Sequence, residues 1–157
     1  MSRIKKVTLL VDGPNIYRYA KFVANEAFGC MLRDIKEIAE QFGFVDTGKA
    51  VVYFDPNVNK HPKILDFARR SRYAAVVGSN SSNDFRIHEL LIKDGEKYLA
   101  GDDTDLLALS AGSLIYCPLA GSAEKYGKKL LLIYPSGETS KELRDACHIT
   151  AKIRSMR

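Results

Sequence analysis

Three aspartates stand directly after short apolar runs, at the points where buried strands would end. Asp12 follows the run VTLLV, and Asp103 and Asp105 follow the run from Lys97 to Ala100. If both runs are strands of one parallel sheet, their carboxyl ends bring the three side chains to the same edge. Clustered carboxylates repel one another, and a hard dication that prefers oxygen ligands removes that repulsion. The pattern predicts a site for Mg²⁺ or Mn²⁺ held by Asp12, Asp103 and Asp105.

A purely structural interpretation of the same residues is also open. Asp12 would begin a turn, while Asp102, Asp103 and Asp105 would cap a helix and complement the dipole of its first turn. This interpretation explains the second cluster well. It does not explain why two strand ends would both place acids at the same edge.

Strands and helices are expected to alternate along the chain. The expected strands are 7–11, 50–54, 74–77, 97–100 and 129–134, and the expected helices are 32–42, 62–71, 84–93, 106–109 and 139–149. The last helix is expected to open with a capping box at Thr139 to Glu142, and the stretch 112–121 is irregular. The strands are apolar throughout, which is typical of a parallel sheet covered on both faces. The pattern predicts a three-layer α/β/α sandwich with a mostly parallel sheet.

Size and composition fit one globular domain over residues 1–157. The chain has 157 residues, of which 46% are hydrophobic and 27% charged. No apolar run approaches the roughly 20 residues of a membrane helix, so a cytoplasmic protein without membrane contact is expected. The net charge of +5 suits a polyanionic partner such as a nucleic acid.

Histidines and aromatic residues add less to the prediction. His61, His88 and His148 lack the close spacing of a zinc site and are expected at the surface or in packing. Tyr17, Tyr19 and Phe22 could stack on bases, but their helical spacing is more typical of core or edge packing. The loop 78–83 (GSNSSN) could present backbone N–H groups to a phosphate, although an ordinary polar loop is the simpler interpretation.

Several segments resemble one known family. The run LLVDGPNIY, residues 9–17, resembles the opening strand and loop of NYN domains, the LabA-like branch of the PIN-like nucleases. AGDDTDLLAL, residues 100–109, is similar to the family's second acidic signature, and residues 127–146 resemble its last strand and helix. The resemblance implies a PIN-like fold, metal roles for Asp12, Asp103 and Asp105, and a supporting role for Asn15. It also implies an RNA substrate, preferably single-stranded.

The central part of the chain departs from this family pattern. The family usually has two acids six residues apart on a central helix, and the best register here gives Asn83 and Glu89, with Asp84 adjacent. Glu89 could bind metal or orient the attacking water, and Asp84 could be a further metal ligand. A solvated acid on a helix face is the alternative for Glu89.

A second register of the acidic signature is also open. The segment AGSLIYCPLA, residues 111–120, lies at the distance before Gly127 where the family's double-Asp motif often falls, and it contains no acids. In that register Asp103 and Asp105 have another role, and the protein is a binding domain with a degraded site. The first register is favoured because GDDTDLL follows an apolar run and supplies carboxylates.

The sequence therefore predicts a metal-dependent endoribonuclease. Asp12, Asp103 and Asp105 would hold one or two Mg²⁺ or Mn²⁺ ions that activate a water for attack on a phosphodiester. Glu89 would position the water, and Asn15 would fix a metal ligand. The alternatives are a catalytically degraded RNA-binding or regulatory module and a metal-dependent phosphatase. A homodimer stays open as the assembly.

Overall fold

A parallel sheet forms the centre of the computed structural model, which describes residues 4–78, 87–135, 137 and 139–153. Within these residues the sheet has six strands in the order β3-β2-β1-β4-β5-β6, and every neighbouring pair is parallel. The strands are β1 (Val7–Asp12), β2 (Ala50–Phe54), β3 (Ala74–Val77), β4 (Leu106–Ser110), β5 (Lys129–Tyr134) and β6 (Ile149–Lys152). Apolar side chains fill β1, β2, β4 and β5 on both faces, as a sheet between two helical layers requires.

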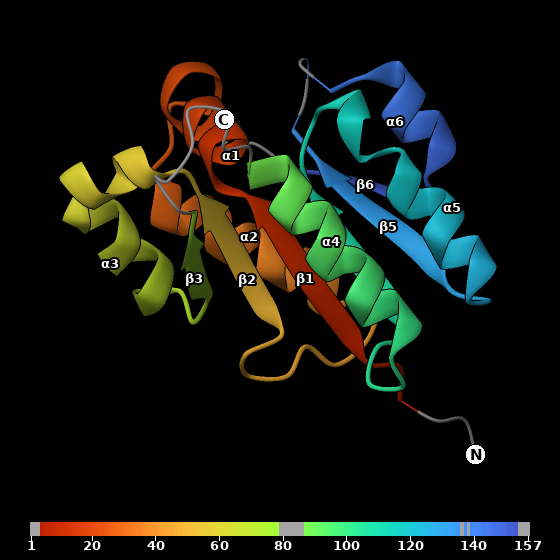
Figure 1. Cartoon of the computed structure of the whole chain (residues 1–157). Helices are drawn as coiled ribbons and strands as arrows, with labels where there is room; N and C mark the ends of the chain where they lie inside the picture. Colours follow the sequence, from red (N-terminus) through yellow and green to blue (C-terminus); the bar gives the residue numbers. More distant parts are fainter. Residues whose placement is uncertain (1–3, 79–86, 136, 138, 154–157) are drawn as a thin grey trace.

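Helices cover both faces of the sheet, as Figure 1 shows. They are α1 (Gly13–Tyr19), α2 (Phe28–Glu40), α3 (Pro62–Arg70), α4 (Ile87–Ala100), α5 (Pro118–Lys125) and α6 (Lys141–Ala146), with short turns η1 (Ala20–Ala24), η2 (Pro56–Lys60) and η3 (Leu114–Tyr116). The helices α1, α2 and α3 share one buried cluster with Leu9 and Val11. On the opposite face, α4, α5 and α6 pack around Leu10 and Leu107. The predicted α/β/α sandwich is confirmed, with a sheet that is parallel throughout its described strands.

Two predicted elements around the second acidic cluster are wrong. The expected strand 97–100 is the end of α4, and the expected helix 106–109 is strand β4. Buried Leu91, Gly95 and Leu99 lie four residues apart and continue one helical stripe past residue 93, the predicted end of the helix. An added Cβ at Gly95 would lie 2.8 Å from a terminal methyl of Leu119, so the glycine allows α4 and α5 to pack closely. The run LLALS is short and apolar, a pattern that does not by itself distinguish a strand from a buried helix.

The end of the chain also differs from the prediction. Helix α6 stops at Ala146, and β6 follows it beside β5. The helix cap is Ser140, whose hydroxyl accepts a hydrogen bond from the backbone of Leu143, rather than Thr139. Among the described residues, no helix is long and apolar enough to cross a membrane.

The strand directions define two edges that matter for the site. We call the ends of β1, β2 and β4 at Asp12, Phe54 and Ser110 the carboxyl edge, and the opposite ends the amino edge. Along β1 and β4 the register pairs Val7 with Leu106 and Val11 with Ser110. Residues just before β4 therefore lie at the amino edge, a full strand length from Asp12.

Candidate functional site at the carboxyl edge

Asp12 ends β1 at the carboxyl edge and caps the helix that follows. Its backbone is still extended, with φ −77° and ψ 98°, and its Oδ1 accepts a hydrogen bond of 3.1 Å from the backbone N–H of Asn15. Pro14 stands in the first turn of α1, where its missing N–H costs nothing. The sequence Asp-Gly-Pro-Asn thus folds locally into a capped helix start.

Gly13 lets this turn sit directly against the neighbouring strand. A Cβ at this position would collide with the carbonyl oxygen of Tyr53 and with the ring of Phe54. The register places Asp12 beside Tyr53 of β2, so the turn has no room to move outward. The absence of a side chain at Gly13 is therefore what allows the turn after Asp12 to pack against β2.

The second oxygen of Asp12 is bound by a tyrosine from the far side of the chain. Tyr116, at the end of η3 and fully buried, donates its hydroxyl to Oδ2 of Asp12 over 2.7 Å. Both carboxylate oxygens of Asp12 therefore already accept hydrogen bonds from the protein. Neither Tyr116 nor this contact was singled out from the sequence. The sequence feature that could have pointed to Tyr116 is the acid-free segment 111–120, which contains it.

Burial sets the protonation behaviour of this pair. Desolvation raises the pKa of Asp12 above its ordinary value of 3.8, and the hydrogen bonds from Tyr116 and Asn15 and the charges of Arg18 and His88 only partly oppose it. Desolvation, followed by the negative charge of Asp12, raises the pKa of Tyr116 far above its ordinary value. Tyr116 is therefore a permanent hydrogen-bond donor at neutral pH. His88, expected at the surface or in packing, lies close enough to Asp12 to act on it electrostatically.

Asn15 lies at the carboxyl edge as predicted, but it contacts Asp12 in a different way. Its backbone N–H, rather than its side chain, donates to Asp12. Within the described part of the chain, the side-chain oxygen of Asn15 is buried and has no hydrogen-bond partner, and the same holds for the hydroxyl of Ser110. Buried polar atoms without partners are unusual and mark positions where water or a ligand can bind.

Asp103 and Asp105 lie at the amino edge, so the predicted grouping with Asp12 is wrong. The backbone N–H of Lys6, just before β1, donates to Oδ2 of Asp105 over 2.8 Å. Asp103 forms an exposed ion pair with Lys6 at 3.9 Å. The physical reason for the error is the assignment of strand 97–100. Once α4 extends to Ala100, the acidic loop enters β4 instead of leaving a strand.

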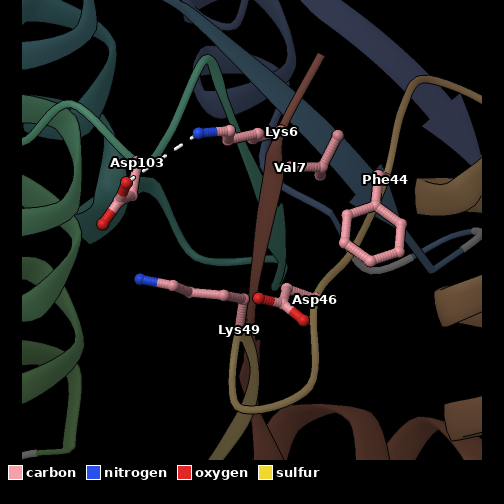
Figure 2. A pocket seen from close by; sticks show the side chains of 6 residues that line it. All are labelled: Lys6, Val7, Phe44, Asp46, Lys49 and Asp103. Atoms are coloured by element: carbon pink, nitrogen blue, oxygen red, sulfur yellow. Dashed lines mark ion pairs between the residues drawn. The ribbon is translucent and has the colours of Figure 1, made fainter. Parts of the chain in front are cut away.

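Figure 2 shows this amino-edge pocket, with the ammonium group of Lys6 pointing toward Asp103. Phe44, Asp46 and Lys49 form the rest of its polar and aromatic lining. Nearby, the hydroxyls of Thr8 and Thr104 share a buried hydrogen bond of 2.7 Å. Asp105 and Thr104 therefore join the loop before β4 to the start of β1, which is a structural role.

The other predicted acids give little support to a metal centre. Glu89 is exposed in the first turn of α4, and it has an interaction of its own within the protein. Asp84 and Asn83 lie outside the described residues, as does most of the loop 78–83. Glu89 thus remains a prediction for a water-positioning role, and the structure describes nothing of Asp84.

The donor set at the carboxyl edge does not fit Mg²⁺ or Mn²⁺ within the described residues. After β4 the chain continues with Ala111, Gly112 and Ser113, none of which carries a carboxylate. Both oxygens of Asp12 are already hydrogen-bonded. Among the residues that the structure describes, no three His, Cys, Asp or Glu side chains are grouped so as to hold a metal ion. Hard dications need several oxygen ligands, and of the two acids at these strand ends Asp12 begins α1 and Asp55 caps η2, with no third acid grouped with them among the described residues.

A parallel sheet between two helical layers, with polar residues beyond its central carboxyl ends, defines a doubly wound α/β domain. The chain belongs to the NYN domain family, whose model matches residues 6–153. The NYN domain is a branch of the PIN-like superfamily, and its members are generally assigned as nucleases. A crystal structure of a protein of unknown function from Vibrio parahaemolyticus has the same fold, with a TM-score of 0.78 and 18% identity over 98% of this chain and 97% of that one. No curated protein matches the chain.

Proposed function

We propose that this protein is an RNA-binding NYN module that has lost metal-dependent cleavage. One observation carries the proposal: the described residues group no three acidic, His or Cys side chains that could hold a metal, and the two oxygens of Asp12 instead accept hydrogen bonds from Tyr116 and from the backbone of Asn15. In this account the second register of the acidic signature applies, so that Ala111, Gly112 and Ser113 stand where an active relative would have acids. The carboxylate acts as a helix cap and hydrogen-bond acceptor.

Charge and family membership support RNA as the ligand. The chain carries 24 Lys and Arg residues against 19 Asp and Glu residues. Proteins that bind nucleic acid draw much of their affinity from release of counterions around phosphates, a contribution that needs no metal. The family itself generally acts on nucleic acid, and a member that no longer cleaves can keep the surface that binds it.

Binding without a metal is the direct test. A fluorescent single-stranded RNA is titrated with the protein in EDTA, and anisotropy gives the affinity at several salt concentrations. The proposal expects binding in EDTA that weakens steeply as salt increases. No binding in EDTA at low salt, or binding that appears only after Mn²⁺ is added, would contradict it.

A metal-dependent ribonuclease is the second candidate, and one observation favours it. The buried side-chain oxygen of Asn15, beside Asp12, has no partner in the described part of the chain. A cation or its bound water could bind that oxygen, and Asp84 could supply a further ligand. A metal-dependent phosphatase would need the same clustered oxygens. Metal-dependent hydrolysis of RNA or of a phosphomonoester, respectively, would favour these alternatives.

A further inference from the structure

A second surface, formed by α1, η1, α3 and the start of α2, combines exposed aromatic rings with positive charge. A pocket there is lined by Tyr17, Lys21, Phe28 and Phe67 of α3, together with Glu26. Phe67 is 42% exposed, and Phe22, next to Lys21 in η1, is 71% exposed. Exposed rings that gather beside one pocket form an apolar patch, and such patches mark binding sites more often than single exposed rings do.

The floor of this pocket is rigid. Tyr17 packs edge-on against Phe28 at a centroid distance of 5.4 Å, and Phe28 packs in the same way against Phe54 at 6.1 Å. Phe28 is buried, and Phe54 is the side chain that abuts Gly13 beside Asp12. An aromatic chain thus connects the pocket to the carboxyl edge.

A cation lies over the exposed rings. The ammonium group of Lys21 is 5.8 Å from the ring centre of Tyr17 and 5.4 Å from that of Phe22. In the turn η1 the helix widens and then ends at Asn25, which has a left-handed backbone with φ 51°. The turn leaves Phe22 and Val23 facing outward next to this charge.

The elements around the pocket carry an excess of positive charge. Arg18 and Lys21 on α1 and η1 have no acidic neighbour in those elements, and α3 contributes three basic residues against one acid. These side chains of α3 are Lys63, Arg69 and Arg70, with Asp66 as the acid. Asp66 forms an ion pair with Arg70 at 3.1 Å. Glu26 also lines the pocket beside Lys21, so the positive excess comes from Arg18 and from the side chains of α3. In the amino-edge pocket of Figure 2, Asp46 and Asp103 balance Lys6 and Lys49.

We propose that this aromatic and basic surface binds unpaired bases of a single-stranded RNA, an inference that rests on the proposed function. One base stacks on Phe67 in the pocket, a neighbouring base stacks on Phe22, and Lys21 pairs with the phosphate between them. Stacking on aromatic side chains accepts any base, because every base has a π face. The seven residues of α1 span roughly 10 Å, about two nucleotides, so a strand that crosses the carboxyl edge reaches the pocket.

A single tryptophan can report the contact directly, because the chain contains none. In Phe67→Trp the new indole keeps a stacking face in the pocket, and oligouridine should quench its fluorescence in a saturable manner. The matched control is Phe44→Trp, which replaces a 56% exposed ring at the amino edge. The proposal expects quenching of the first indole with little change in the second. Equal quenching of both, or quenching of the control alone, would overturn it.

Alanine variants measure how much the surface contributes to affinity. Phe67→Ala and Phe22→Ala should each weaken binding of single-stranded RNA roughly tenfold, whereas Phe44→Ala should leave it unchanged. A fully paired duplex should bind no better to the wild type than to Phe67→Ala. Thermal melts check that each variant is folded, which we expect because the replaced rings are exposed.

The outcomes separate this inference from the proposed function. If the wild type does not bind RNA, the proposed function fails and takes the inference with it. If the wild type binds and both alanine variants bind equally well, only the inference fails. A wild-type dimer that dissociates in Phe67→Ala, with RNA affinity unchanged, would instead assign this surface to a second copy of the chain.

Discussion

Tyr116 donates a 2.7 Å hydrogen bond to Oδ2 of Asp12, across a sequence separation of 104 residues. In a metal-dependent nuclease built on this edge, that oxygen would face a cation. Here that oxygen accepts a hydrogen bond from a neutral hydroxyl of η3, and the raised pKa of Tyr116 keeps the proton in place at neutral pH. The pair joins the end of β1 to the segment after β4 at the carboxyl edge.

Removing this hydroxyl should destabilise the fold. In Tyr116→Phe the buried oxygen of Asp12 loses its donor, and a buried acceptor left without a partner costs about 1–3 kcal/mol. Urea denaturation of the two proteins measures the loss. Tyr126→Phe is the control, because Tyr126 is 41% exposed and its replacement should change the unfolding free energy little. Equal stability of Tyr116→Phe and wild type would show that the bond contributes nothing.

Asp12→Asn should be tolerated at neutral pH and should change the pH dependence of stability. The amide can accept from Asn15 and donate to Tyr116, and it avoids the cost of a buried charge. The folded pKa of Asp12 is raised above 3.8, so protonation favours the folded state. This contribution is complete below pH 3.8 and is lost as pH rises through the raised pKa.

The measurement is the difference in unfolding free energy between wild type and Asp12→Asn across that pH window. Wild type should gain stability relative to the variant as pH falls, and the variant should be at least as stable at pH 7. A wild type that loses relative stability on acidification would mean that Asp12 is held as a charged group with a lowered pKa. That result would favour a strong cationic partner at the site.

The sequence predicts the fold well wherever its pattern has one interpretation. The strands 50–54, 74–77 and 129–134 match β2, β3 and β5 because each is a short apolar run bounded by turn residues. The error at 97–109 has a local cause. The apolar residues of α4 continue past Gly95, whose need for close packing against Leu119 is a tertiary fact that the sequence pattern does not contain.

Because of this one wrong assignment, the prediction placed two of its three metal ligands, Asp103 and Asp105, at the wrong edge of the sheet. Asp12 could be placed from the sequence because a strand and a capped helix start flank it directly. The partner Tyr116 could not, because its contact with Asp12 depends on how η3 follows β4. The acid-free segment 111–120 was the available signal, because it begins directly after β4 at the carboxyl edge.

Asp103 and Asp105 should be dispensable for RNA binding. Asp103→Asn removes an exposed ion pair with Lys6, so its stability should change by less than about 1 kcal/mol. Asp105→Asn keeps an oxygen that can accept from the backbone of Lys6. Anisotropy titrations should give wild-type affinity for both. A large loss of affinity at normal stability would place RNA at the amino edge instead.

Gly13→Ala should be strongly destabilising, because its Cβ meets the backbone of Tyr53, which cannot rotate away. Overpacking of this kind costs about 1–3 kcal/mol and here also displaces Asp12. Gly121→Ala in α5 is the control, since nothing lies within 4 Å of its added Cβ. It should stabilise the helix by about 0.5–1 kcal/mol. Similar melting temperatures for the two variants would refute the close approach at Gly13.

Cleavage of RNA under conditions that support binding tests the central claim most directly. End-labelled single-stranded RNA is incubated with saturating protein in Mg²⁺, in Mn²⁺ and in EDTA, and the products are separated on a denaturing gel beside an Asp12→Asn reaction. The account predicts that the RNA is bound and remains intact in all of them. Cleavage that requires the metal and disappears in both EDTA and Asp12→Asn would contradict the account and establish a nuclease at the carboxyl edge.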